Sequence, residues 1–137
     1  MLTYFFVTTS IFISCGPKQQ RISLKNLLPT QINSVPIGMK YEDFSQRFAK
    51  KEFEQINIGN SILYLKESIE SPELRFIQYQ FQNNTLAEVL IGYKASFAAK
   101  DIATELYGDP NENGVWLAEY NNQNVVIQIV DNTLIYR

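Results

Sequence analysis

Two pairs of acidic residues have a spacing suited to acid–base chemistry: Glu52 with Glu54, and Asp101 with Glu105. Paired carboxylates can serve as a general acid and a general base. Asp101 and Glu105, however, stand four residues apart beside Lys100, which is typical of a solvated helix face. The sequence has no histidine and one cysteine, and it contains no phosphate-cradling glycine loop or serine-centred hydrolase motif. We therefore expect a protein that is not an enzyme and that needs no cofactor.

A second group of oxygen-bearing side chains lies in residues 109–114, Asp-Pro-Asn-Glu-Asn-Gly. Asp109, Asn111 and Asn113 stand at positions 1, 3 and 5 of what begins like a calcium loop, with glycine at position 6. The twelfth position, which should be a bidentate glutamate, is Tyr120. We interpret the segment as a turn between a helix and a strand, with these three residues as a weaker candidate metal site.

The cysteine, Cys15, follows an uncharged apolar segment, residues 1–14. Fourteen residues are too few to cross a bilayer, which takes about 20, but they match the apolar region of a secretory signal. The sequence Phe-Ile-Ser-Cys at 12–15 resembles the bacterial lipobox, in which the cysteine is lipidated and becomes the new N-terminus. We predict a signal peptide at 1–14, lipidation at Cys15 and a tether or lead-in at 15–35. The alternatives are a buried strand that contains the cysteine, and secretion without a lipid.

The location that follows is the cell envelope, with the protein anchored to a membrane through its N-terminal lipid. The outer membrane is the expected one, on its periplasmic or surface face. The formal net charge is −2, and lysines and arginines are scattered along the chain. A nucleic-acid-binding protein would need a clustered basic face, so we expect no nucleic acid as a partner.

The first predicted helix follows residue 36. Ile37, Tyr41, Phe44 and Phe48 fall at i, i+4, i+7 and i+11, which is one face of a helix. Strands are predicted after it at 62–66, 74–82 and 87–93, and Asn83-Asn84 is expected to form a hairpin turn because asparagine tolerates positive φ.

The same order is predicted a second time. Ala98, Ile102 and Leu106 mark a second amphipathic helix, with Ser96 as its N-cap and Gly108 at its C-terminal end. The strands that follow are predicted at 115–120, 125–130 and 133–136. Each half thus consists of one helix and three strands. We predict a single α+β domain at 36–137, an antiparallel β-sheet with two helices on one face, made of αβββ units at 36–94 and 95–137.

Two stretches resemble a known family. The sequence PIGMKYEDF, at 36–44, is similar to the start of the first helix in the SmpA/OmlA lipoproteins of the outer-membrane β-barrel assembly machinery. ATELYGDPNENGVWLAEY, at 103–120, is similar to their passage from helix to strands, and the αβββ layout occurs twice in β-lactamase-inhibitor-protein-like folds. The resemblance implies this architecture and export route, and no binding site. The matching letters are Gly38, Met39, Gly108, Pro110, Trp116 and Tyr120.

The strands are rich in aromatic residues, and a sheet with helices on one face leaves its other face open. Alternation predicts that Leu74 and Phe76 lie on the side opposite Ile77, Tyr79 and Phe81. The candidate partner-binding residues are Leu74, Phe76, Trp116 and Tyr120. Trp116 is also expected to pack on Ile102 or Leu106, which would make it structural.

We expect a lipid-anchored envelope protein that acts as a non-catalytic scaffold or protein-binding module, with another envelope protein as its partner. The alternative is a lipoprotein that binds a small ligand or calcium.

Overall fold

The computed structural model describes residues 22–23, 35–120 and 122–137. The predicted signal peptide, Cys15 and nearly all of the tether lie outside the described residues. None of the helices in the described part of the chain has the length and hydrophobicity needed to cross a membrane. The elements, in chain order, are β1 (Ile22–Ser23), α1 (Tyr41–Arg47), β2 (Glu54–Ile58), β3 (Ile62–Ser68), β4 (Leu74–Gln82), β5 (Thr85–Tyr93), α2 (Ala99–Tyr107), β6 (Trp116–Tyr120), β7 (Gln123–Val130) and β8 (Thr133–Tyr136).

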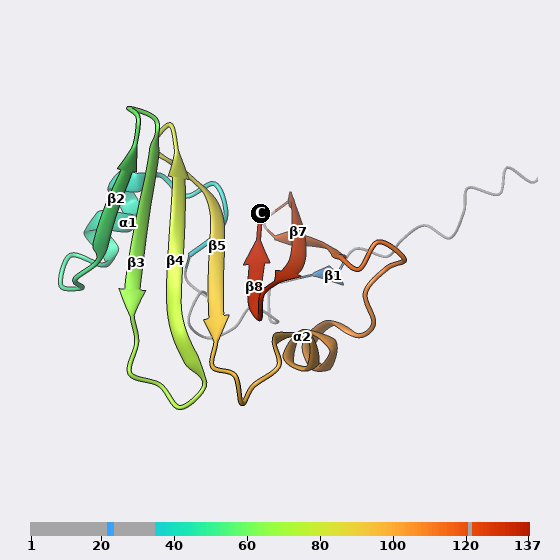
Figure 1. The fold of residues 1–137 in the computed structure, drawn as a ribbon. Coiled ribbons are helices and arrows are strands. Elements are labelled where there is room, and N and C mark those ends of the chain that lie inside the picture. The colour runs from blue at the N-terminus through green and yellow to red at the C-terminus, as the bar shows by residue number, and fades with distance from the viewer. Residues whose placement is uncertain (1–21, 24–34, 121) are drawn as a thin grey trace, which may run out of the picture.

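The strands form one sheet in the order β1-β6-β7-β8-β5-β4-β3-β2 (Figure 1). Consecutive strands are antiparallel neighbours within β2–β5 and within β6–β8, and β5 pairs with β8 to join the two halves of the chain. The two-residue β1 is parallel to β6. The prediction of an α+β fold with a mainly antiparallel sheet is confirmed.

Asparagine turns close two of these hairpins, as the sequence predicts for the first. Asn83 and Asn84 have φ of 48° and 63°, and Asp131 and Asn132 have φ of 48° and 58°. Two successive residues with positive φ give the hairpin twist that matches the twist of the flanking strands.

The first half contains one strand more than predicted, because β2 precedes β3. All five residues of β2 are exposed. Its sequence, EQINI, offers only two apolar residues, Ile56 and Ile58, which is too short an alternation to mark a strand. The strand is held by backbone pairing with β3, a long-range property, and the prediction of three strands here was wrong.

The helix α1 also begins later than predicted, at Tyr41, and Ile37 lies in a turn before it. Gly38 has φ of 90°, and its N–H donates to the Leu86 carbonyl. The Leu86 N–H donates in return to the Met39 carbonyl. Backbone bonding to the start of β5 thus replaces the first predicted helical turn.

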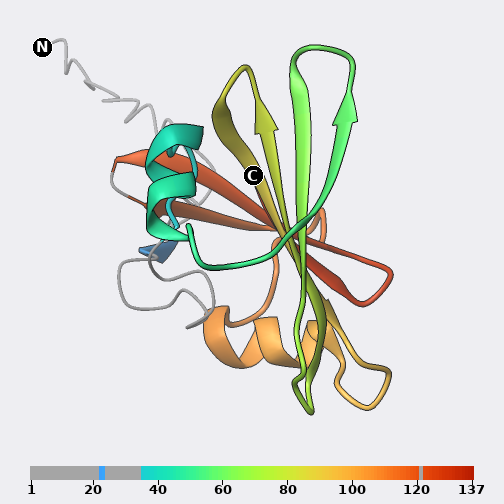
Figure 2. The same cartoon turned by 90° about the vertical axis from the view of Figure 1, so that its left-hand side faces the viewer.

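Buried side chains form a continuous row across six strands. The register aligns Leu65, Tyr79, Val89, Tyr136, Ile127 and Trp116, each at most 4% exposed. The Phe44 ring of α1 lies 4.8 Å from the Tyr79 ring, and Figure 2 shows α1 beside this part of the sheet. The Tyr107 ring of α2 lies 6.4 Å from Trp116, and its hydroxyl is 2.8 Å from the Tyr136 hydroxyl. We call this row the inner row.

Candidate binding surface

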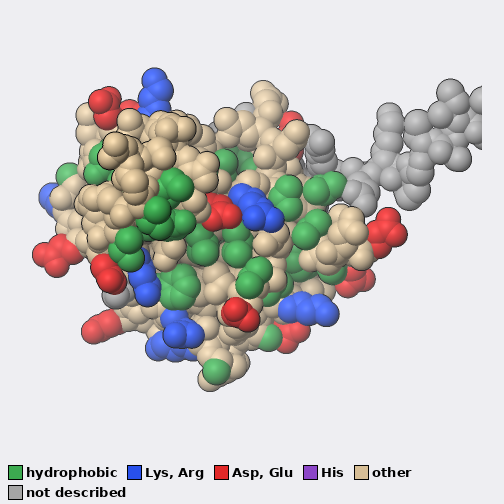
Figure 3. All heavy atoms as spheres, turned by 45° about the horizontal axis from the view of Figure 1, so that its top comes forward, with side chains coloured by type: hydrophobic (Ala, Val, Ile, Leu, Met, Phe, Trp, Pro, Cys, Tyr) green, Lys and Arg blue, Asp and Glu red, His purple; other side chains and the backbone are tan. Residues whose placement is uncertain are grey.

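The residues next to the inner row along each strand point to the opposite face of the sheet. They align as Glu54, Lys66, Gln78, Leu90, Ile135 and Gln128, and we call the face they share the outer face. Lys66, Gln78, Leu90 and Gln128 are half-buried. The outer face is therefore neither a core nor a fully solvated surface. Figure 3 shows hydrophobic side chains on the molecular surface interspersed with acidic and basic ones.

Phe76 is the candidate residue that lies on the outer face. It is half-buried and stands opposite Gly92 on β5. A Cβ added to Gly92 would overlap the Phe76 ring, so the ring covers the glycine. The Lys66 ammonium lies 4.9 Å from the centre of the same ring, within the range of a cation–π contact.

Charged and amide groups occupy the next part of the outer face. The Arg137 guanidinium lies 3.7 Å from the Glu88 carboxylate and also donates to the side-chain oxygen of Gln128. Backbone hydrogen bonds between Arg137 and Val126 continue the β7–β8 ladder to the C-terminal residue. These groups are partly exposed, so the contacts are screened by solvent and contribute little to stability.

Leu74 and Trp116 do not lie on the exposed face, because each is only 2% exposed. The alternation argument failed at Leu74 because the register shifts between Leu74 and Phe76, so Leu74 pairs with Tyr93 on the inner side. Trp116 belongs to the inner row. Tyr120 follows it at an even spacing, is half-buried and packs against the same core. Phe76 alone among the four is on the outer face.

In the loop at 109–114, the side-chain oxygen of Asn111 is engaged in hydrogen bonds with the nearby backbone. The Asn111 side-chain oxygen accepts hydrogen bonds from the backbone N–H groups of Asn113 and Val115, at 3.0 and 3.1 Å. This arrangement is an asparagine-based turn. In the described ranges, no group of three histidine, cysteine or acidic side chains is placed to hold a metal ion.

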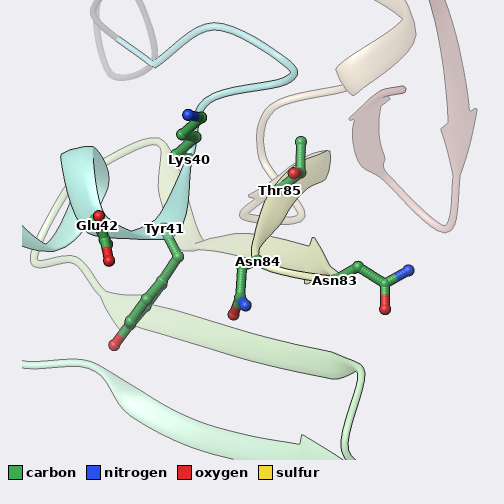
Figure 4. Close-up of a pocket in the computed structure, with 6 residues that line it drawn as sticks. All are labelled: Lys40, Tyr41, Glu42, Asn83, Asn84 and Thr85. Atoms are coloured by element: carbon green, nitrogen blue, oxygen red, sulfur yellow. The ribbon is translucent and has the colours of Figure 1, made fainter.

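A polar hollow of about 380 Å³ lies between the start of α1 and the β4–β5 turn. Its side chains do not converge on a common point, because Lys40 and Thr85 extend in the direction opposite to Tyr41, Glu42 and Asn84 (Figure 4). Its backbone is held together by a hydrogen bond from the Tyr41 N–H to the Asn84 carbonyl. A ligand site needs convergent polar groups, and this hollow does not provide them. The lining residues are Lys40, Tyr41, Glu42, Asn83, Asn84 and Thr85.

A second hollow, of about 250 Å³, lies beside α1, and four of its nine lining residues are aromatic. Phe44 is one of them, with the ring centroids of Phe48 and Phe53 at 4.8 and 5.6 Å from its own. Lys51 lies over the Phe48 ring and forms an ion pair of 2.9 Å with Glu67. We call this space the aromatic hollow. The lining residues are Tyr41, Phe44, Ser45, Phe48, Ala49, Lys51, Phe53, Gln55 and Leu65.

The titratable groups with shifted pKa values are buried tyrosines of the core. Burial raises the pKa of Tyr107 to about 12, and burial followed by the charge of Glu73 raises the pKa of Tyr93. The acid pairs singled out in the sequence, at 52 and 54 and at 101 and 105, are exposed to solvent. Neither pair lines either of the two hollows described above, and acid–base groups need to lie in a cavity.

No protein-family model, curated protein or solved structure matches this chain. The resemblance to the SmpA/OmlA lipoproteins therefore stays a prediction.

Proposed function

We propose that this chain is a lipid-anchored protein of the bacterial cell envelope that binds another envelope protein through its outer face and catalyses no reaction. The proposal combines the signal-like N-terminal sequence with the arrangement of the sheet. The observation that carries it is the half-exposed outer face, which combines the Phe76 ring with amide and charged side chains.

We infer that both helices cover the inner side, so that the outer face is open. The support is the register, because Tyr79, Tyr136 and Trp116 all belong to the inner row. The first of these contacts α1 and the other two contact α2. The tandem relation of the two halves also belongs to this proposal, since each half has a helix that precedes a run of antiparallel strands.

The chemistry of the outer face favours a protein partner. Phe76 supplies apolar area at low conformational cost, and Gln78 supplies an amide that can pair with backbone groups. Lys66 and the Arg137–Glu88 pair provide charges of both signs. Aromatic groups with a polar surround are typical of non-obligate protein interfaces.

The binding face is tested by introducing a charge at its centre. We expect Gln78→Arg to abolish chemical cross-linking of the chain to its partner in intact envelopes, because a bulky cation would separate the two surfaces. Gln46→Arg is the matched control, since Gln46 lies on the exposed side of α1. Both variants should melt like the wild type. If both variants lose cross-linking to the same extent, or if both keep it, the outer face is not the binding surface.

The anchor is tested separately. Mass spectrometry of the membrane-extracted protein should show loss of residues 1–14 and an acylated N-terminal Cys15. Cys15→Ala should release the protein from the membrane, because each buried CH₂ of an acyl chain contributes roughly 0.8 kcal/mol. An intact Met1 on a soluble protein would contradict the anchor. The hypothesis that the outer face binds a partner would still be tested separately by the cross-linking.

The aromatic hollow favours a second candidate function, binding of a small apolar ligand. An apolar fluorescent probe should then bind to the protein. Ala49→Trp should block this binding because the new side chain fills the hollow, and Ala95→Trp on an exposed loop should leave the binding unchanged.

Calcium binding is disfavoured by the Asn111 turn. Calorimetric titration should show no micromolar calcium isotherm, and an isotherm abolished by Asp109→Ala would reverse that conclusion.

A further inference from the structure

The strand β2 ends the sheet on one side, and no strand of the described residues pairs with its outer edge. It is the terminal strand in the sheet order, and β3 is its neighbour on the other side. In the described part of the chain, no backbone hydrogen bond from outside the β2–β3 ladder reaches residues 54–58. An edge of this kind presents a row of free N–H and C=O groups to any strand that approaches.

Natural edge strands are often protected by charged side chains, proline, a bulge or a cover. In the described residues β2 has no proline, bulge or cover, and its one charged side chain is Glu54 at its start. Its pairing with β3 is regular from Glu54, opposite Lys66, to Ile58, opposite Ile62. All five residues are exposed, so neither face of the strand is covered by the described residues. The helix α1 packs farther in, with the Phe44 ring 5.1 Å from Phe81 of β4. None of the described residues therefore blocks the approach of a second strand to this edge.

The exposed apolar side chains of the described residues are concentrated on this strand. Ile56 is 50% exposed and Ile58 is 52% exposed, and both point to the outer face. Val130, at 46%, is the remaining large one and lies at the end of β7. Gln55 and Asn57 point to the other face, where the Gln55 amide lies 3.5 Å from the Asn57 side-chain oxygen.

We propose that two copies of this chain pair through β2, antiparallel, about a two-fold axis at Asn57. This register places Ile56 opposite Ile58 of the second copy, and the two-fold symmetry places Ile58 opposite Ile56 of the second copy. Asn57 then faces Asn57 of the second copy, and Glu54 lies beyond the paired strand residues, beside the β2–β3 turn of the second copy. The pairing is self-complementary, as a two-fold interface must be.

Charge disfavours the registers whose axis lies nearer the start of the strand. An axis at Ile56 or Gln55 would set the Glu54 carboxylate opposite an isoleucine, and an axis at Glu54 would set two carboxylates opposite each other. Like charges directly opposite are destabilising, whereas apolar β-branched pairs are favourable. The axis at Asn57 matches apolar with apolar and amide with amide. The interface is small, so we expect a weak, reversible dimer that does not depend on the lipid anchor.

Disulfide trapping tests the register in the full-length chain with Cys15→Ser, kept in mild detergent. Asn57→Cys should give a disulfide-linked dimer under mild oxidation. Directly opposed residues have Cα atoms about 4.5–5.5 Å apart, which suits a disulfide. Gln55→Cys is the matched control, because it is equally exposed on the same face. Its symmetry mate would lie four residues away along the strand, about 13 Å, too far for a disulfide.

Charge substitution then separates a specific pairing from random collision. Adding Ile56→Lys to Asn57→Cys should lower the dimer yield about tenfold, because both isoleucine pairs are lost. Val130→Lys is a control of similar exposure away from the edge and should leave the yield unchanged. Circular dichroism should show the same fold for each variant. Equal trapping at positions 55 and 57, no trapping at 57, or a yield insensitive to Ile56→Lys would each overturn the proposal.

Discussion

Trp116 shows how one side chain connects an element boundary to the core. Its ring nitrogen donates to the Gly108 carbonyl at 2.8 Å, and its ring lies in the inner row beside Tyr107. Gly108 has φ of 78° at the end of α2, a conformation that glycine adopts without steric cost. The tryptophan thus fixes the turn between α2 and β6. The hydrogen bond also explains why this buried residue is a tryptophan, since phenylalanine could not donate.

We expect Trp116→Ala to lower the free energy of unfolding by about 3–5 kcal/mol, as large aromatic truncations in cores do. Trp116→Phe should cost about 1–2 kcal/mol, because it leaves the Gly108 carbonyl without this donor. Denaturant titration measures both free energies. The control is Leu117→Ala, because Leu117 is half-buried and points to the other face; it shows how far any truncation in β6 lowers stability. If Trp116→Ala unfolds at the wild-type denaturant concentration but loses a membrane partner, the residue is part of a binding face instead.

Gly92 offers a second test at the scale of the residue. Gly92→Ala should lower the free energy of unfolding by about 1–2 kcal/mol, because the new methyl group would overlap the Phe76 ring. The ring can be removed with Phe76→Ala, and in that background Gly92→Ala should cost nothing or stabilise the strand. A double-mutant cycle measured by thermal denaturation gives the coupling. Additive effects would show that the ring does not rest on Gly92.

At the scale of the element, the N-terminus of α2 is capped by Asn132, which lies near the C-terminal end of the second half of the chain. Ser96 is not the N-cap. The helix begins after Ala98, and the Asn132 side-chain oxygen accepts from the Ala99 N–H at 2.8 Å. The Asn132 amide group donates to the carbonyls of Tyr93, Lys94 and Phe97. A hairpin turn thus caps a helix 33 residues earlier in the chain, which no local pattern could predict.

Asn132→Gly should lower the free energy of unfolding by about 2 kcal/mol, because it removes the cap and leaves the amide's carbonyl partners unsatisfied. Glycine keeps the positive φ, so the change isolates the side chain from the backbone conformation. Asn84→Gly, at the equivalent turn between β4 and β5, has an exposed side chain and should change stability by only a few tenths of a kcal/mol. Chemical denaturation compares the two. Equal losses at both turns would mean that the Asn132 side chain contributes no more than an ordinary turn residue.

At the scale of the whole molecule, the two halves are held together by the β5–β8 pairing and by buried tyrosines. The Tyr107 and Tyr136 hydroxyls share a hydrogen bond in the core, and burial raises the pKa of both. Burial also raises the pKa of Tyr79. The chain has no histidine, the side chain that ordinarily titrates near neutrality. Its response to pH in the alkaline range should therefore be dominated by these phenols.

We expect the free energy of unfolding to change little between roughly pH 6 and 9 and to fall above about pH 10. An unfolded tyrosine titrates near 10, whereas Tyr107 in the folded state titrates at about 12. The raised folded pKa means that the folded state holds its proton longer, so stability is complete below pH 10 and is lost as the pH rises through 12. Urea unfolding at a series of pH values measures the slope, and Tyr107→Phe should reduce it. A midpoint independent of pH up to 12 would contradict the burial of these hydroxyls.

The sequence by itself determined those elements whose pattern of apolar and polar residues follows from local structure. Periodic rings predicted β4 and the centre of α1, and asparagine pairs predicted a hairpin turn. It could not reveal β2, the shifted register at Leu74 or the remote cap at Asn132. Each of these depends on groups brought together from distant positions, through backbone pairing, a bulge or a side-chain hydrogen bond. The free edge and the outer face are likewise properties of the assembled sheet, because only the pairing order decides which strand ends it.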